Sequence, residues 1–185
     1  MFGFMLNLGY RSNTMKNFVF VFLLLSSCAV FAQEKYGATT HQFSISGKVK
    51  NPSVITMDTL QHYMSAVIGD IKVTDNTGAF KHNDDQLKGI LLKDILSHTV
   101  FDTPSPKLLS AFYFTCVGSD GYKVVYSWNE LYNTEVGNHV YILTEKNGVK
   151  ADQLPESIQM TSMMDMKTGR RYLHNLDKII VSQVN

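Results

Sequence analysis

The sequence is poor in cysteine and has no hydrophobic run long enough to span a membrane. Cys28 and Cys116 are the two cysteines in 185 residues. Removal of an export signal ending at Ala32 would leave Cys116 alone, which excludes an internal disulfide and a two-cysteine redox pair. The apolar run Phe18–Leu25 is far shorter than the ~20 residues that span a bilayer, so a retained transmembrane anchor is not expected.

Basic side chains are too few for a nucleic-acid-binding protein. The chain has 17 Lys and Arg against 16 Asp and Glu. Loss of Arg11 and Lys16 with the export signal would leave 15 basic against 16 acidic residues, a net charge of −1. Nucleic-acid binding depends on neutralising phosphates, and no run of Lys and Arg supplies that charge. We therefore expect no nucleic-acid partner.

Common catalytic and metal-binding motifs are absent as well. The sequence has no Gly-rich phosphate loop, no nucleophile elbow and no His-Glu-x-x-His motif, so nothing favours a nucleotide-binding protein or a hydrolase. His82, Asp84 and Asp85 carry side chains that can ligate metals. Because no second ligand pair stands at a fixed helical spacing, we interpret them as part of an ordinary surface loop.

The first 32 residues have the pattern of an export signal. Lys16 precedes the apolar run, and Ala32 ends a stretch with a small residue suited to cleavage. Met15 is an alternative true start, because Met15-Lys16-Asn17 is already a short charged n-region. Leu25-Ser-Ser-Cys28 resembles a lipoprotein box, so acylation of Cys28 is a second route. We expect an exported protein, periplasmic or secreted, or anchored through Cys28 in that alternative.

The remaining chain predicts a single α+β domain. Residues 33–42 are polar and are expected to form a flexible leader before a domain over residues 43–185. Short runs of alternating or β-branched residues predict many strands in mixed sheets. Thr56 and Ser127 are N-cap candidates for short helices. Many short strands with a few short helices are typical of an α+β fold.

Several segments carry specific expectations. Residues 66–74 alternate as a strand, with Val67 and Val73 on one side. The polar residues 75–86 predict a surface loop, and residues 90–96 predict a short buried helix. Strands are also expected at residues 140–144, 158–164, 172–176 and 179–184, with a hairpin turn at Lys146-Asn-Gly148.

The most informative stretch is Ala111–Leu131, AFYFTCVGSDGYKVVYSWNEL. Its aromatic and β-branched opening predicts a mostly buried strand. Gly118-Ser-Asp-Gly121 predicts a tight turn, and the residues that follow predict a second strand. Ser127 and Glu130 have the spacing of a capping box at the start of a short helix.

This stretch belongs to a series of segments that occur in a characteristic order. The others are Ser46–Pro52, Ile55–Leu60, Lys88–Leu96, Asp165, Arg170–Tyr172 and Lys178–Val181. The series resembles the molybdopterin-binding domain of the sulfite oxidase family over residues 43–184. The resemblance implies that fold, a molybdopterin cofactor and oxidoreductase chemistry on a small oxyanion or sulfoxide. In that family the molybdenum is held by two pterin sulfurs and one cysteine thiolate.

The cysteine ligand of the family has no counterpart in this chain. It precedes the segment matched by Lys88 and Gly89, yet residues 66–86 contain no cysteine. Cys116 lies instead in the strand before the Asp-Gly-Tyr turn. A lone cysteine in an apolar strand is typical of a small buried hydrophobe. Molybdenum catalysis in the manner of the family is therefore not expected.

Four residues are candidates for binding a ligand. Asp120 and Tyr122 match the turn of the family, and the resemblance implies that they face the cofactor. Arg170 and Arg171 offer planar guanidinium forks to phosphate or carboxylate. The competing interpretation is structural: a turn carboxylate, a packing tyrosine, and surface arginines paired with Asp165.

Three functions follow from these observations. The favoured one is an exported domain that binds a pterin-type or other small anionic ligand without family-type catalysis. The first alternative is an active molybdopterin-dependent oxidoreductase in which Cys116 or a non-protein ligand completes the metal site. The second is a structural, partner-binding domain with no small ligand, since function resides in sites and not in folds.

Overall fold

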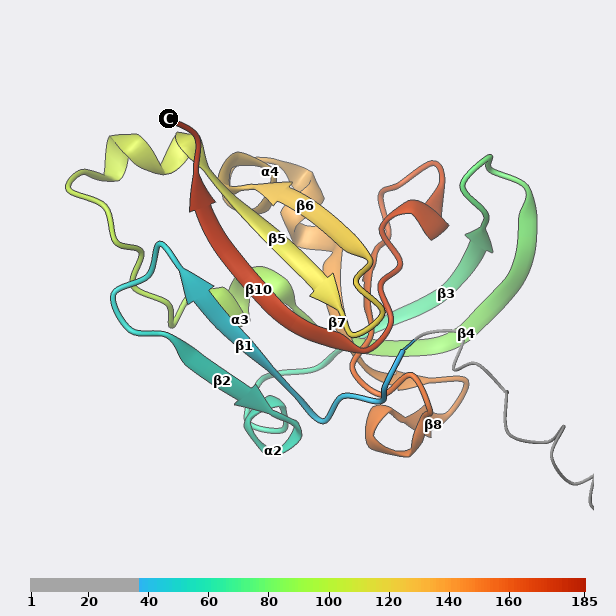
Figure 1. Cartoon of the computed structure of the whole chain (residues 1–185). Coiled ribbons are helices and arrows are strands. Elements are labelled where there is room, and N and C mark those ends of the chain that lie inside the picture. The colour runs from blue at the N-terminus through green and yellow to red at the C-terminus, as the bar shows by residue number, and fades with distance from the viewer. Residues whose placement is uncertain (1–36) are drawn as a thin grey trace, which may run out of the picture. The chain divides into compact units, whose positions relative to one another are not determined.

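The computed structural model describes residues 37–185, in which ten strands form two sheets (Figure 1). They are β1 Gln42–Gly47, β2 Ser53–Thr56, β3 Ala66–Thr74, β4 Phe80–Leu91, β5 Phe112–Gly118, β6 Lys123–Ser127, β7 Val140–Lys146, β8 Val149–Lys150, β9 Met160–Ser162 and β10 Leu176–Gln183. The expected α+β class is confirmed. The expected export signal and Cys28 lie outside the described residues.

The first sheet has the order β2-β1-β10-β5-β6. β1 runs parallel to β10 and the other pairs are antiparallel, so the sheet is mixed as expected. Alternate residues of its strands face the interior: Phe43 and Ile45 are each 1% exposed, and Phe112, Phe114 and Cys116 are equally buried. This period of two is the direct consequence of the pleat.

The second sheet has the order β3-β4-β7-β8, with β9 also paired to β7. All of its pairs are antiparallel. The β7–β8 hairpin turns at Asn147 and Gly148, which have φ of 55° and 75°. Two consecutive residues with positive φ suit the twist of a two-residue hairpin, and the predicted turn is confirmed.

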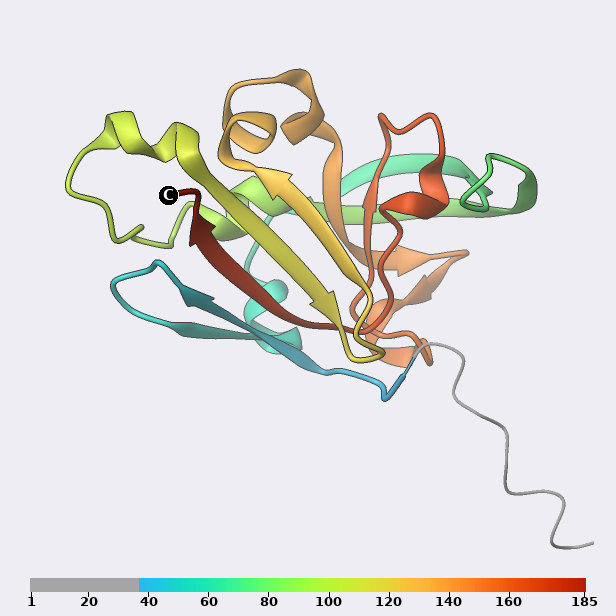
Figure 2. The same ribbon diagram turned by 45° about the horizontal axis from the view of Figure 1, so that its top comes forward.

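Short helices connect the strands. They are α2 Met57–Leu60, α3 Leu92–Leu96 and α4 Trp128–Tyr132, with 3-10 turns η2 Pro106–Ala111, η3 Glu135–His139, η4 Ala151–Gln153 and η5 Thr168–Arg170. Both predicted N-caps are confirmed, and Ser127 with Glu130 forms a complete capping box. In Figures 1 and 2, α3 and α4 lie on the side of the first sheet that faces the second.

Three expectations for the middle and end of the chain were wrong in their boundaries. The polar residues 75–86 are not a loop, because β4 begins at Phe80 after a short turn in which Asp75 Oδ1 accepts from the backbone of Thr77, Gly78 and Ala79. The helix expected from residue 90 begins at Leu92. Between residues 158 and 176 only β9 is a strand, apart from an isolated Met160–Leu173 bridge and the first residue of β10.

The prediction that Val67 and Val73 lie on the same face of β3 is confirmed only in part. Ile71 and Val73 are buried, but Val67 is 79% exposed. The β3–β4 register shifts between Val67 and Gly69 and again before Ile71. A bulge changes which face a side chain meets, so strict alternation fails there.

Two hydrophobic clusters stabilise the domain. The larger joins the inner face of the first sheet to α3, α4 and β7, with Phe114, Tyr126 and Ile142 among its fully buried members. The smaller contains Ile71, Val73, Leu87, Leu143 and Tyr172 and lies on the second sheet.

The described part of the expected leader contacts the domain. Ser119 Oγ donates to the Ala38 carbonyl at 2.6 Å, and Thr39 Oγ1 donates to the Pro155 carbonyl at 2.8 Å. Among residues 37–185, every helix is too short or too polar for a transmembrane span.

Candidate functional site

The Asp-Gly-Tyr turn joins β5 to β6 as expected. Asp120 Oδ1 accepts from the Tyr122 backbone N–H at 2.8 Å, and Gly121 has φ of 82°. The Asp120 carboxylate therefore stabilises its own turn, which is the ordinary role of an aspartate at this position.

Tyr122 and Arg170 meet at the end of the β3–β4 hairpin. The Tyr122 hydroxyl donates to the Arg170 carbonyl at 2.8 Å, and Arg170 Nε donates to the Asn76 carbonyl at 3.1 Å. Both side chains are exposed. The structure thus brings Asp120, Tyr122 and Arg170 together. Asp120 contacts the backbone N–H of Tyr122, and the Tyr122 hydroxyl contacts the backbone carbonyl of Arg170.

Arg171 is the centre of a separate polar cluster. Its Nε donates to Asp165 Oδ2 at 2.7 Å, its Nη2 donates to Asp165 Oδ1, and its Nη1 donates to Glu130 Oε1 at 3.2 Å. The guanidinium also lies over the Tyr126 ring, 4.6 Å from its centroid. We call these four residues the Arg171 cluster. The pairing of Arg171 with Asp165 is the one that the structural interpretation of the sequence expected. It occupies the guanidinium N–H groups that an anionic ligand would need.

The Arg171 cluster raises the pKa values of two of its members. Hydrogen bonding to Asp165 raises the pKa of the Arg171 guanidinium, which stays charged at any physiological pH. Burial raises the pKa of the Tyr126 hydroxyl well above its usual range. The Arg171 guanidinium therefore stays charged beside a neutral Tyr126 hydroxyl.

The loop before Arg171 packs tightly on the end of β3. Thr168 Oγ1 donates to the Lys72 carbonyl at 2.8 Å and accepts from the Thr74 N–H at 3.0 Å. A Cβ at Gly169 would lie 2.0 Å from the Thr74 carbonyl oxygen, so only glycine fits. This part of β3 falls within residues 66–86, the segment to which the resemblance noted in the sequence would assign the cysteine ligand.

Cys116 does not offer a metal ligand. Its side chain is 0% exposed within the larger hydrophobic cluster, and burial raises the pKa of the thiol to about 12. A metal-ligating cysteine must be a thiolate with access to the metal. Within residues 37–185 no group of three or more His, Cys, Asp or Glu side chains could hold a metal ion. The residues present do not fit a molybdenum centre, and the structure gives no support to the Cys116 alternative.

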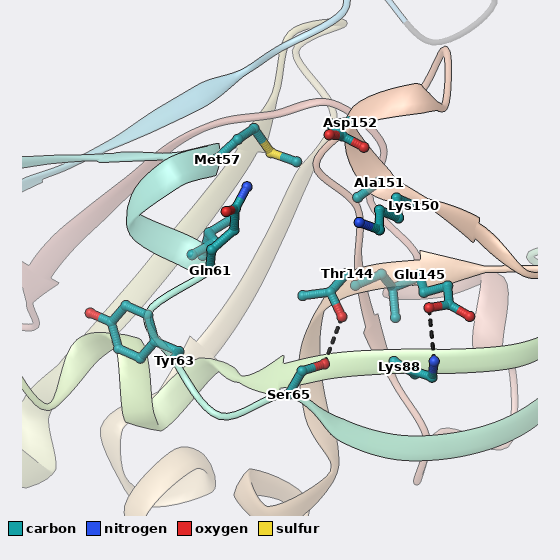
Figure 3. Close-up of a pocket in the computed structure, with 12 residues that line it drawn as sticks. Met57, Gln61, Tyr63, Ser65, Lys88, Thr144, Glu145, Lys150, Ala151 and Asp152 are labelled. Carbon is teal, nitrogen blue, oxygen red and sulfur yellow. Dashed lines mark hydrogen bonds and ion pairs between the residues drawn. The ribbon is translucent and has the colours of Figure 1, made fainter.

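An open pocket lies elsewhere, between α2 and the β7–β8 hairpin (Figure 3). Its volume is about 360 Å³, within the range of ~300–1,000 Å³ usual for small-molecule sites. Met57, Leu60 and Leu143 supply an apolar lining, and Tyr63 adds an aromatic ring. We call this space the α2–β8 pocket.

Polar groups in the α2–β8 pocket fall into two kinds. Lys88 Nζ donates to Glu145 Oε2 at 2.9 Å, so these two charges compensate each other. Lys150, in contrast, forms no ion pair or hydrogen bond with its side chain in the described part of the chain. Figure 3 shows its ammonium and the Gln61 amide directed toward the same space from opposite walls.

None of the four predicted residues lines the α2–β8 pocket. Sequence reasoning missed Gln61, Lys88 and Lys150, because they come from the C-cap of α2, from β4 and from β8 and share no motif. The sequence did contain one signal for the position of Lys150. The predicted turn at residues 146–148 folds the chain back along β7, and this places Lys150 opposite Glu145 in the β7–β8 pair.

The expected surface group His82, Asp84 and Asp85 also needs correction. Asp84 is only 3% exposed, accepts from the Tyr172 hydroxyl at 2.7 Å and lies 3.4 Å from His82 Nε2. It is buried within β4, between the exposed residues Asn83 and Asp85, where a loop was expected. Near it, His174 stacks on Tyr172, and burial lowers the pKa of His174 to about 4.

Comparison with known proteins rests on structure. No protein-family model matches the chain, and no curated protein matches it in sequence. Among solved structures, the chain is similar to the sulfane dehydrogenase SoxCD from Paracoccus pantotrophus, with a TM-score of 0.55 and 13% identity. The fold is that of a molybdopterin enzyme. The match covers 76% of this chain but only 38% of the SoxCD chain, and at this identity it shows the fold alone.

That likeness confirms the fold class expected from the sequence, an α+β domain of the sulfite-oxidase molybdopterin-binding type. It carries no information about the ligand of this chain or about export. The candidate sites therefore have to be judged from their own chemistry.

Proposed function

We propose that this protein is an exported domain that binds a pterin-type or other small anionic ligand and does not carry out molybdenum chemistry. The ligand is held in the α2–β8 pocket. The observation that carries the proposal is the Lys150 ammonium, which enters this pocket without an ion-pair partner among the described residues. Export rests on the signal pattern of residues 1–32 alone.

The argument against molybdenum chemistry concerns the ligand set. The sole cysteine of residues 37–185 is buried in the apolar core, and the end of β3 is packed against Thr168 and Gly169. No step through a metal is therefore assigned to this domain. Molybdopterin remains relevant as a chemical class, because the molybdopterin-enzyme fold makes a pterin ring a reasonable ligand to test.

The α2–β8 pocket has the composition that a small anionic ligand requires. Lys150 offers three N–H donors to an anionic group, and the Gln61 amide adds further donors from the opposite wall. Met57 and Leu143 present apolar surface to a ring. A charge-assisted hydrogen bond contributes more than a neutral one, so Lys150 should dominate affinity for the anionic end.

Calorimetric titration of the purified exported protein tests the proposal. The probes are pterin-6-carboxylate, inorganic phosphate and sulfate. We expect at least one probe to bind and Lys150→Met to weaken that binding by about tenfold, since loss of a hydrogen bond to a charged group costs roughly 1.5 kcal/mol or more.

Lys107→Met is the matched control, because Lys107 is an exposed lysine of η2 outside the pocket. It should leave the dissociation constant unchanged. Equal affinity in the wild type, Lys150→Met and Lys107→Met, or no binding of any probe, would overturn the proposal.

A further inference from the structure

The β7–β8 hairpin, which carries Lys150, is bonded to β4 at its turn. The Asn147 N–H donates to the Asp85 carbonyl at 2.8 Å, and Asn147 Oδ1 accepts from the Asp85 N–H at 2.7 Å. We call this pair of hydrogen bonds the Asn147 clamp. Among the strands of residues 37–185, β8 pairs with β7 alone and is two residues long. A hairpin end of this kind has little stability of its own, so the clamp holds the turn in place.

A β-bulge in β4 makes the clamp possible. Lys88 pairs with Glu145 in the β4–β7 ladder. From that pair to the clamp, β7 advances two residues to Asn147, whereas β4 spans three residues to Asp85. β4 therefore has one extra residue here, and Gln86 has φ of 54°, which is uncommon for a residue other than glycine. Bulges change the direction of the side chains beside them.

The clamp lies close to three of the charged side chains of the α2–β8 pocket. The strand pairing places them in one row, with Lys88 opposite Glu145 and Glu145 opposite Lys150. Figure 3 shows all three among the side chains that line the pocket. Residues directly opposite on neighbouring strands share a face, with Cβ atoms about 5 Å apart. A shift of the hairpin against β4 would therefore move Lys150 relative to Lys88.

We propose that Asn147 is a positioning residue of the α2–β8 pocket. Its two hydrogen bonds to Asp85 fix the hairpin so that the Lys150 ammonium faces the bound anion. Asn147 itself does not line the pocket. This inference rests on the proposed function and adds the residue outside the pocket that sets the place of its cation. Asparagine suits the role because it tolerates positive φ, here 55°, and carries a side-chain acceptor.

Asn147→Gly breaks one bond of the clamp and keeps the turn, because glycine adopts positive φ freely. We expect the variant to fold and its Asp85 amide hydrogen to exchange faster, as measured by NMR. Calorimetry should show about fivefold weaker anion binding, since the hairpin then spends only part of the time in the binding-competent position. The probe is whichever of phosphate, sulfate and pterin-6-carboxylate binds the wild type most tightly.

A double-mutant cycle with Lys150→Met separates positioning from a general loss of stability. In the Lys150→Met background, Asn147→Gly should not weaken binding further, because the side chain that the clamp positions is already absent. A merely structural asparagine would lower the free energy of unfolding without changing the dissociation constant of the folded protein.

Asn138→Gly is the matched control. Asn138 is an exposed asparagine of η3 whose Oδ1 accepts from Lys93, outside the pocket. Its replacement also removes a side-chain acceptor and should leave the dissociation constant unchanged.

The outcomes distinguish this inference from the proposed function. Three results would overturn the role of Asn147 and leave anion binding intact: an Asp85 amide that exchanges at the wild-type rate in Asn147→Gly, an unchanged dissociation constant in that variant, or an equal loss of affinity in the wild-type and Lys150→Met backgrounds. Absence of binding of every probe to the wild type would overturn both proposals.

Discussion

The Arg171 cluster and the α2–β8 pocket both contain basic and acidic side chains. The charges of the cluster are paired with one another, whereas Lys150 and Asp152 of the pocket have no ion-pair partner within residues 37–185. In the cluster, Nε and both terminal nitrogens of Arg171 donate to Asp165 and Glu130. In the pocket, Lys150 and Asp152 have no such partners among residues 37–185 and face an open space of about 360 Å³. The comparison teaches that a cation is available to a ligand only where the protein has not already neutralised it, whatever the sequence around it resembles.

Replacement of Arg171 should have the largest effect on stability. Arg171→Met leaves the Asp165 carboxylate, whose side chain is 12% exposed, without its ion-pair partner and with only the Ser162 hydroxyl as a donor. Removing one member of a largely buried pair costs roughly 3 kcal/mol in the free energy of unfolding. Urea denaturation measures this loss, and ligand affinity should not change.

Arg170→Met is the matched control for Arg171→Met. Arg170 is exposed, so its replacement should change the free energy of unfolding by less than about 0.5 kcal/mol. Equal losses in the two variants, or weaker ligand binding in Arg171→Met, would show that the cluster is not a purely structural element.

Gly169→Ala should have the next largest effect. The added methyl group would lie 2.0 Å from the Thr74 carbonyl oxygen, so the loop would have to move away from β3. Overpacking of this kind costs roughly 1–3 kcal/mol. Thermal unfolding compares this variant with Lys167→Ala, the exposed neighbour; a variant as stable as the wild type would mean that the loop is not closely packed.

The network around His174 should make stability depend on pH. Burial lowers the pKa of His174 to about 4 in the folded state, below its value of about 6.5 in the unfolded chain. The unfolded chain then binds more protons between these values, so stability is complete above pH 6.5 and falls as the pH drops toward 4. We expect a loss of about 1 kcal/mol between pH 7 and pH 5, after allowance for the partly exposed ring.

Denaturation of the wild type and His174→Gln at both pH values checks this expectation. The variant should lose less stability than the wild type on acidification. An identical pH dependence in the two proteins would assign the effect to other groups.

Replacement of Lys150 should have the smallest effect on stability and a clear effect on binding. Lys150→Met removes an exposed side chain that stabilises no partner, so the free energy of unfolding should stay within about 0.5 kcal/mol. The same variant should bind pterin-6-carboxylate about tenfold more weakly. A loss of stability in Lys150→Met as large as that in Arg171→Met would mean that Lys150 of the α2–β8 pocket stabilises the fold as the Arg171 cluster does.

Local signals in the sequence predicted much of the fold. The capping box of Ser127 and Glu130 and the turns at Gly121 and Gly148 depend on a few adjacent residues, and all form as expected. The β4 strand was missed because its polar face reads as a loop, although Asp84 on that strand is buried against Tyr172. Such burial depends on a partner 88 residues away in the sequence.

The candidate site was less predictable than the fold. Spacing placed Arg171 next to Asp165 but could not show that the pair would also contact Glu130 and lie over Tyr126. The α2–β8 pocket joins residues of α2, β4, β7 and η4, which only the sheet order brings together. Pockets of this kind leave no local pattern in the sequence.

Metal analysis tests the central claim most directly, namely that residues 37–185 have the fold of a molybdopterin enzyme but lack the ligand set for molybdenum. The full chain should be purified from a host that makes and exports the assembled cofactor, and its molybdenum content measured beside Cys116→Ser. We predict far less than one molybdenum per chain in both proteins. One molybdenum per chain in the wild type, lost in Cys116→Ser, would contradict the account.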